Sequence, residues 1–122
     1  MNDAPSKADR MRIRQALSDV FVDNEVDYPS IAKAIKSYEA SCIEHIFFNE
    51  VAPVCYSNLL SPVPPIWAAF DASWLESEIE KMLDARDSSV LRRLKDRVLV
   101  AYLRWRLDGE WRTLETELRK HR

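Results

Sequence analysis

The fold class is decided by one stretch near the C-terminus, Arg97-Val98-Leu99-Val100-Ala101-Tyr102-Leu103-Arg104-Trp105-Arg106-Leu107. Its apolar residues cover every side of a helix, and a helix that is apolar all round is normally buried. The stretch is too short and too charged to cross a bilayer, which takes roughly 20 apolar residues. We therefore expect a buried central helix at about 90–107, inside a compact all-α bundle.

The length and composition of the chain indicate one helical domain over 1–122, with residues 1–5 disordered. Apolar residues make up 47% and charged residues 31% of the chain, which is typical of globular proteins. A domain of this size buries enough surface to fold without a metal or a disulfide. The single glycine, Gly109, argues against all-β folds and phosphate-binding loops, because both need several glycines.

Capping residues and prolines divide the chain into five to six helices. Polar side chains that accept from backbone N–H groups mark helix starts, and proline interrupts a helix. The three prolines within 61–66 predict an extended connector. The first expected helix is capped by Ser6 or Asp9 and reaches about Phe21, and the second is capped by Asp27 ahead of Pro29 and reaches about Lys36. The third starts at Ser37 or at Ser41, of which the capping box with Glu44 favours Ser41, and it has a kink or break at Pro53. Asp71 and Ser88 cap the next two helices, and a last segment follows a helix end or kink at Gly109.

The N-terminal residues and the cysteines favour a cytoplasmic protein. No apolar signal region follows Met1, so we expect no secretory peptide. Cys42 and Cys55 are 13 positions apart. On one helix this spacing places them about 20 Å apart, whereas a disulfide needs Cα atoms within about 7 Å. We expect two reduced thiols in the core.

The charge is divided unevenly along the chain. Residues 1–85 carry 14 acidic and 7 basic residues, a net charge of −7, whereas residues 86–122 carry 6 acidic and 11 basic residues, a net charge of +5. One interpretation is that the two parts attract each other within the fold. The other is that an acidic face meets a basic partner.

The densest acidic segment contains Asp19, Asp23, Glu25 and Asp27. A calcium loop needs a glycine at its sharp turn and a bidentate glutamate in register, and the segment has neither. It is therefore a solvated, helix-capping turn or a contact patch for a basic partner.

Two further clusters contain residue types that can carry chemistry. Cys42 and His45 share a helix face, but no third zinc ligand stands at a recognisable spacing, and a nucleophilic cysteine needs an orienting group. The glutamates at 76–80 lack the inward Glu-x-x-His pairs of dinuclear metal bundles, so a solvated face is expected. We expect no catalytic, cofactor or metal site.

Aromatic residues occur in two further settings. Arginines and Lys95 form a basic strip interleaved with aromatics over 92–111, which is typical of nucleic-acid binders. Such domains are usually strongly basic, however, and this chain has a pI near 5.7. The arginines are expected to neutralise the acidic half or to cover core aromatics. Trp67, Phe70 and Trp74 follow the proline connector, where they cover the core or form part of a recognition surface.

Three stretches together resemble a family of short bacterial proteins classed only as a domain of unknown function. They cover roughly residues 10–85 and are Ala16-Leu17-Ser18-Asp19-Val20-Phe21-Val22-Asp23-Asn24-Glu25, then Glu50-Val51-Ala52-Pro53-Val54-Cys55 with Asn58-Leu59, then Trp67-Ala68-Ala69-Phe70-Asp71 with Trp74-Leu75. Where the family has a glycine-bearing segment, this chain has Pro64-Pro65-Ile66, which places a shared loop function in doubt. The family implies no catalytic residues. Its size and lack of motifs are similar to those of immunity proteins paired with bacterial toxins.

The expected function is a non-enzymatic protein-binding module, in its most concrete form an immunity protein that occludes a cognate toxin. Acidic side chains would face a basic cleft, with no cofactor, nucleic acid or membrane involved. A regulatory or scaffold protein that forms a homodimer through the C-terminal helices is the alternative, and a metal-dependent enzyme is a third hypothesis. The candidate partner-binding residues are Asp19, Asp23, Glu25, Asp27, Glu50, Trp67 and Trp74.

Overall fold

The computed structural model describes residues 5–21, 26–59 and 72–121, and within these ranges every regular element is a helix. Because α3, a π-helical segment and α4 run on without a break, the described residues form six continuous helices. This confirms the predicted all-α bundle of five to six helices. The elements are α1 (Lys7–Ser18) with a 3₁₀ turn (Asp19–Phe21), α2 (Tyr28–Ile35), α3 (Ala40–Ile46), the π segment (Phe47–Val51), α4 (Ala52–Leu59), α5 (Ala72–Ser88), α6 (Val90–Arg106) and α7 (Asp108–Lys120).

Two predicted helix caps are present as expected. The Ser6 hydroxyl accepts from the backbone N–H of Asp9 at 3.1 Å, and the Asp9 carboxylate accepts from the backbone N–H of Ser6 at 3.3 Å. At the start of α2, the Asp27 carboxylate accepts from the backbone N–H of Ser30 at 3.1 Å. Both caps depend only on residues three apart, which is why the sequence reveals them. The proline connector at 61–66, the Asp71 cap and residues 1–4 lie outside the described residues.

Three predicted boundaries are wrong. α3 begins at Ala40 after Glu39, so Ser41 lies inside the helix and does not cap it. Ser89 caps α6 by accepting from the N–H of Arg92 at 3.1 Å, whereas Ser88 is the last residue of α5. The turn between α6 and α7 falls at Leu107, and Gly109, which has no positive φ, lies within the first turn of α7. Serine next to serine, and glycine near a helix end, leave a boundary open by one or two residues.

Pro53 does not break its helix. It has no N–H to donate to the carbonyl of Asn49, four residues earlier. The Arg86 guanidinium donates to that carbonyl instead, at 2.8 Å from Nη1. The backbone just before Pro53 is π-helical, a conformation that absorbs local disruption of the ladder. A side chain from α5 thus allows the helix to continue from Ala40 to Leu59.

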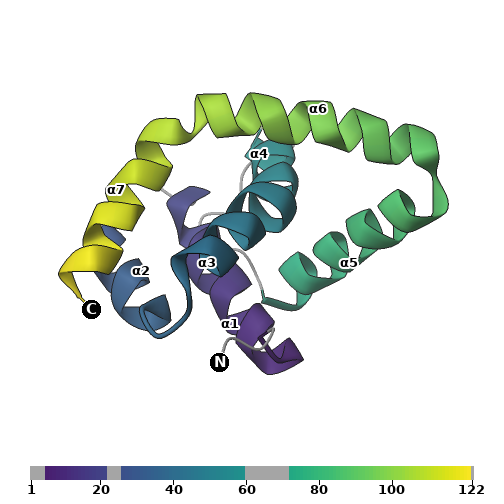
Figure 1. Cartoon of the computed structure of the whole chain (residues 1–122). Helices are drawn as coiled ribbons and strands as arrows, with labels where there is room; N and C mark the ends of the chain where they lie inside the picture. The colour runs from purple at the N-terminus through teal and green to yellow at the C-terminus, as the bar shows by residue number, and fades with distance from the viewer. Residues whose placement is uncertain (1–4, 22–25, 60–71, 122) are drawn as a thin grey trace.

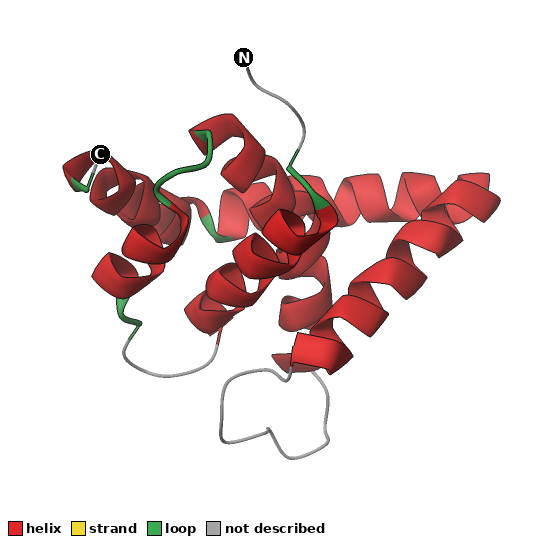
Figure 2. Ribbon diagram, turned by 90° about the horizontal axis from the view of Figure 1, so that it is seen from below, coloured by secondary structure: helices red, strands yellow, loops and turns green. Residues whose placement is uncertain are grey.

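The buried apolar side chains of the described residues form one cluster, with the exception of Met82. Phe47 is fully buried and stacks against Phe21 and Trp111, with ring centroids 5.8 and 6.0 Å apart. α2 lies between α1 and α7 and packs against both, so the N- and C-terminal helices share this core (Figure 2). Among the described residues, no helix is both long enough and apolar enough to cross a membrane.

The predicted buried central helix at about 90–107 is wrong. α6 runs along one edge of the molecule, joined to α5 at one end and to α7 at the other (Figure 1). Within α6 only Asp96 and Leu103 are buried. The stretch has apolar residues on every side, but α6 also carries six cations, and immersing them in a core would cost far more than the apolar burial could return. The core closes beneath one side of α6 and leaves the other side exposed.

Candidate protein-binding surface

An unbroken apolar stripe occupies the outer side of α6. Its members recur at alternating spacings of three and four residues, the spacing at which apolar residues line one side of a helix in two-helix packing. Leu91, Val98 and Trp105 are 77%, 72% and 74% exposed. We call this stripe the α6 face and define it as Leu91, Leu94, Val98, Ala101 and Trp105.

The α6 face points away from the rest of the molecule because the opposite side of α6 is anchored. Asp96 and Leu103 are buried there, seven residues apart and therefore on one side of the helix. Leu99 and Val100 are partly buried and pack against the core cluster. α6 thus has one inward side, which the fold uses, and one outward apolar side, on which the described residues place nothing.

Asp96 is the polar anchor of α6. Its carboxylate accepts from Nε of Arg86 at 2.7 Å and from Nε of Arg92 at 3.1 Å. Arg86 also donates to the Asn49 carbonyl, so one guanidinium ties α5 and α6 to the π segment. A carboxylate this deeply buried is tolerated because two guanidinium groups share its charge.

A second anchor lies nearer the C-terminal end of α6. The Arg104 guanidinium sits 4.7 Å from the centre of the Phe48 ring and donates to Glu44 at 3.2 Å. On the other side of the helix, the hydroxyl groups of Tyr56 and Tyr102 lie 3.2 Å apart. These contacts hold α6 across α3 and α4 and fix the direction of the outward face.

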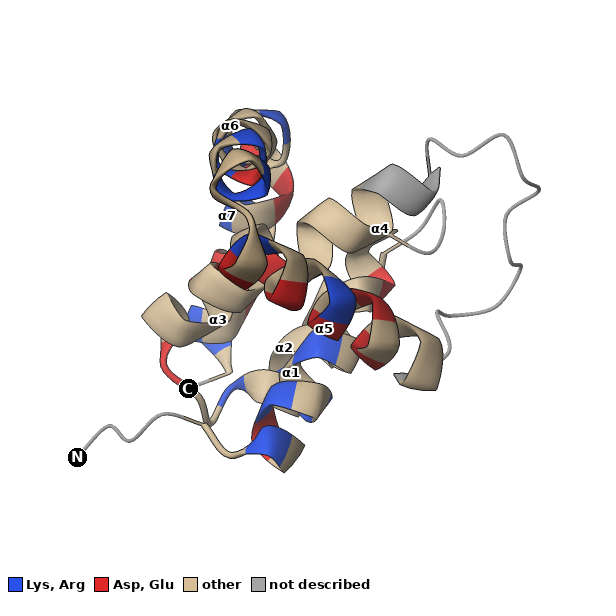
Figure 3. Cartoon of the chain, turned by 90° about the vertical axis from the view of Figure 1, so that its right-hand side faces the viewer, with Lys and Arg blue, Asp and Glu red and all other residues tan. Residues whose placement is uncertain are grey.

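Cations border the α6 face on both sides. Lys95 follows one edge of the stripe, and Arg97 and Arg104 follow the other. The helix carries six basic residues and one acidic residue, Asp96, which faces inward. Figure 3 shows Lys and Arg in blue on α6. A surface of this composition favours an acidic counterpart.

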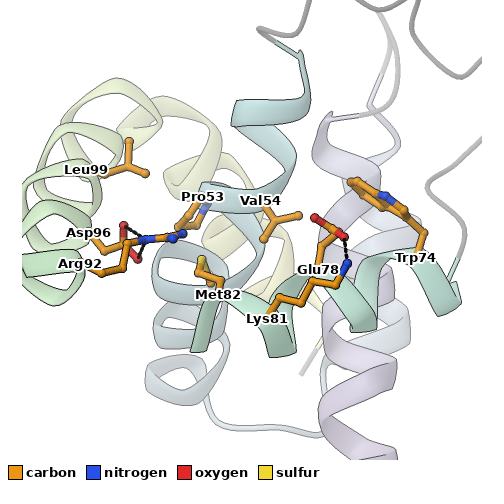
Figure 4. A pocket seen from close by; sticks show the side chains of 9 residues that line it. All are labelled: Pro53, Val54, Trp74, Glu78, Lys81, Met82, Arg92, Asp96 and Leu99. Carbon is orange, nitrogen blue, oxygen red and sulfur yellow. Dashed lines mark hydrogen bonds and ion pairs between the residues drawn. The ribbon is translucent and has the colours of Figure 1, made fainter. Parts of the chain in front are cut away.

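Two hollows adjoin α6. The first has a volume of about 420 Å³ and opens between α4, α5 and α6, with Trp74, Met82 and Leu99 among its lining residues (Figure 4). The second measures about 230 Å³ and lies beside the Arg97 border, lined by Asn49, Arg86, Arg93, Asp96, Arg97 and Val100. Three arginines against one aspartate make the second hollow cationic, and we call it the arginine hollow.

The comparison with known families covers most of the chain, including α6. A family model described as a domain of unknown function, DUF7079, matches residues 8–117. The chain belongs to the DUF7079 family. The resemblance expected over roughly 10–85 therefore extends through α6 and into α7. No curated protein and no solved structure matches the chain.

The prediction that Glu50 binds a partner is wrong for this DUF7079 chain, because Glu50 lies inside the fold. It is 2% exposed and is ion-paired with Arg10 and Arg14. Arg14, which is 3% exposed, also contacts Glu76 at 2.6 Å and Glu80 at 3.2 Å. Burial alone lowers the pKa of Arg14, but the charges of Glu50 and Glu76 raise it above its ordinary value, so the guanidinium stays charged.

The same cluster changes the interpretation of the glutamates at 76–80. Glu76 is largely buried against Arg14 and joins α5 to α1, whereas Glu78 pairs with Lys81 at 3.2 Å and remains more exposed. The expected solvated face is therefore only partly correct. The attraction within the fold includes acids and bases that both belong to residues 1–85, so it is not simply an attraction between the two halves of the chain.

The predicted acidic patch is only partly visible in this family member. Asp19 and Asp27 both line a hollow of about 640 Å³ between α1 and α2, so the structure brings these two together. Burial raises the pKa of Asp19, whereas hydrogen bonds from Ser30 lower the pKa of Asp27. Asp23, Glu25 and Trp67 lie outside the described residues.

Among the described residues, no contact joins a cysteine thiol to a histidine. Cys42 and Cys55 are free thiols, and burial raises the pKa of each above its ordinary value. The Nδ1 atom of His45 lies 3.3 Å from the side-chain nitrogen of Asn49. Within the ranges that the structure describes, no three His, Cys, Asp or Glu side chains gather as a metal site would require.

The α6 face was missed at the level of sequence, although a signal for it exists. The spacing of Leu91, Leu94, Val98, Ala101 and Trp105 is visible in the sequence, and so are the cations beside it. Interpreting the stretch as apolar on all sides concealed the difference between its two sides. Only the burial of Asp96 and Leu103 reveals which side faces inward.

Proposed function

We propose that this DUF7079 protein is a non-enzymatic protein-binding module and that the α6 face is its contact surface. One observation supports this most strongly. Of the seven large apolar side chains that are exposed among the described residues, six lie on α6, and the seventh is Met11. Contiguous apolar surface of this kind marks interaction sites in soluble proteins.

The gain from covering this face is large. Burying one Leu or Val side chain is worth about 1.5–3 kcal/mol, and a tryptophan near the centre of an interface is a frequent anchor of binding energy. Trp105 is held on a helix whose inward side is already packed, so binding requires little ordering of the surface itself. We expect Trp105 and Val98 to contribute most to binding.

In its narrower form, the proposal is an immunity protein that occludes a cognate bacterial toxin. The similarity in size and lack of motifs to immunity proteins supports this form. The burial of Glu50 removes one of the acids expected to face a basic cleft. Occlusion through the α6 face would instead cover an apolar or acidic surface of the toxin.

A homodimer of a regulatory or scaffold protein remains the second candidate. The exposed apolar face lies on a C-terminal helix, which is where this alternative places the dimer contact. The cations along both borders oppose it, because two copies would bring like charges together. A stable dimer in sedimentation at low salt would favour this candidate.

Site-specific photocrosslinking tests the proposed contact surface. Replacing Val98 with p-benzoylphenylalanine in the source cells is expected to yield an adduct with one protein partner, identified by mass spectrometry. The matched control carries the same group at Arg119, an exposed position on α7. Adducts that are equal at both positions, or that form only within the same chain, would contradict the proposal.

A further inference from the structure

We propose that the partner contributes an amphipathic helix whose apolar residues pack along the α6 face and whose acidic residues lie along its basic borders. This inference rests on the proposed function, since it names the kind of partner for the same surface. Its basis is the combination of residue spacing, charge and shape on α6.

The spacing of the face indicates a helical counterpart. Apolar residues at intervals of three and four form the narrow stripe along which two helices interlock side chains, whereas an extended strand presents side chains at intervals of two. The stripe from Leu91 to Trp105 spans two heptads, and a helix of 17 residues is about 25 Å long. A partner helix of similar length would cover the face from end to end.

The charges at the borders indicate that the partner helix is acidic. Residues beside an apolar stripe meet the corresponding residues of the partner helix. Arg104 already pairs with Glu44. Lys95 and Arg97 have no ion pair within the part of the chain that the structure describes, so a carboxylate on a partner helix would supply the first.

The arginine hollow gives one such carboxylate a place to bind. Arg86 and Arg92 already donate hydrogen bonds to the Asp96 carboxylate. Arg93 donates through Nε to the backbone carbonyl of Arg86 at 3.2 Å. Arg93 and Arg97 both line the hollow, and Arg97 also borders the α6 face. A glutamate from a helix on the α6 face could reach both guanidinium groups, which recognise carboxylates in a fork geometry.

A second copy of this chain fits the face poorly. The residues that border the stripe on α6 include Lys95, Arg97 and Arg104, and the acid of this helix faces inward. Pairing two α6 helices, parallel or antiparallel, would oppose cations with cations or with Tyr102. A membrane surface is a further possible occupant, but a chain of net charge −2 with an apolar stripe this narrow favours a helix.

Designed peptides test the inference directly. Three fluorescein-labelled peptides of about three heptads are titrated with the full-length protein and followed by fluorescence anisotropy. The first has leucine along its stripe and glutamate at the bordering positions, the second has lysine at those positions, and the third is a scrambled version of the first. We expect the glutamate peptide to bind at least about tenfold more tightly than the other two, and its affinity to fall as salt screens the charges.

A charge-reversal variant provides the second part of the test. R93E/R97E is expected to reverse the preference between the glutamate and lysine peptides. R119E/K120E makes the same change of charge on exposed residues of α7 and is expected to leave the preference unchanged. Circular dichroism of both variants shows whether the fold is intact.

Several outcomes would overturn the inference while leaving the proposed function standing. These are equal binding of the glutamate and lysine peptides, an unchanged preference in R93E/R97E, and binding to anionic phospholipid vesicles but to none of the peptides. Each can occur together with a partner adduct at Val98, which is the evidence for the proposed function. Failure of that adduct would instead overturn the function.

Discussion

At the scale of single residues, Arg14 is a buried cation in contact with three glutamates. It is almost fully buried and contacts Glu50, Glu76 and Glu80 from two other elements. A buried guanidinium of this kind contributes less by the pairing itself than by preventing the acids from being buried alone. The position is therefore sensitive to the loss of one partner.

We predict that R14M lowers the free energy of unfolding by about 3–5 kcal/mol, because among the described residues Glu50 then keeps only Arg10 as a cationic partner. Urea denaturation measures the change. The control R112M removes an arginine that is 75% exposed and pairs with Asp108, and it should cost less than about 0.5 kcal/mol. Similar losses in the two variants would show that the Arg14 cluster is not buried as described.

Arg86 and Pro53 are predicted to be energetically coupled. Arg86 donates to the Asn49 carbonyl, to which Pro53 has no N–H to donate. In P53A the alanine N–H can bond that carbonyl, so the loss caused by R86M should shrink by about 1 kcal/mol in the P53A background. A double-mutant cycle measured by urea denaturation gives this value, and strict additivity would refute the compensation.

At the scale of elements, the N-cap of α2 gives a prediction about pH. Hydrogen bonds from Ser30 hold the pKa of Asp27 below its ordinary value of 3.8. A depressed pKa in the folded state stabilises the fold above the unfolded pKa and loses this contribution as pH falls through the folded value. D27A should therefore lower Tm at neutral pH, and the difference from wild type should shrink in acid below the folded pKa. A difference that grows in acid would contradict the cap.

The orientation of α6 gives a second prediction at this scale. Leu103 is fully buried, whereas Val98, on the outward side of the same helix, is largely exposed. L103A should cost about 2–5 kcal/mol of unfolding free energy, while V98A should change it by no more than about 0.5 kcal/mol. Equal losses would mean that α6 is buried on both sides, as its sequence first indicated.

At the scale of the whole molecule, the α6 face is an exposed apolar surface at one edge of the fold. α1, α2 and α7 close the core on one side, and α6 extends beyond it from α7 to α5 (Figure 1). The first and last helices thus meet through α2, and the surface left over is on α6. The side of α6 that stabilises the fold and the side that we propose for binding are therefore opposite sides of one helix.

The cations beside the α6 face are expected to oppose self-association of the chain. We predict that the isolated chain sediments as a 14.2 kDa monomer at low salt. Weak association should appear as salt rises, because screening reduces the repulsion between the cations of two α6 helices. V98E should suppress that association. A dimer that is tighter at low salt would support the homodimer hypothesis instead.

The sequence by itself determined the features that depend on neighbours within one turn. Ser6 and Asp27 cap their helices through residues three apart. The apolar stretch at 97–107 and the single glycine predicted the all-α class. The boundaries predicted at Ser41, Ser88 and Gly109 were wrong by one or two residues, because the local sequence leaves the exact end of a helix open over that range.

Only the tertiary structure decided which side of α6 is covered and where Glu50 lies. An apolar residue gains as much from burial on one side of a helix as on another, so the choice depends on what packs beneath it. Glu50 is inside because Arg10 and Arg14, some 36 to 40 residues earlier, reach it from α1. Long-range pairing of this kind has no local signature, and the exposed face of α6 is what remains once those pairings are made.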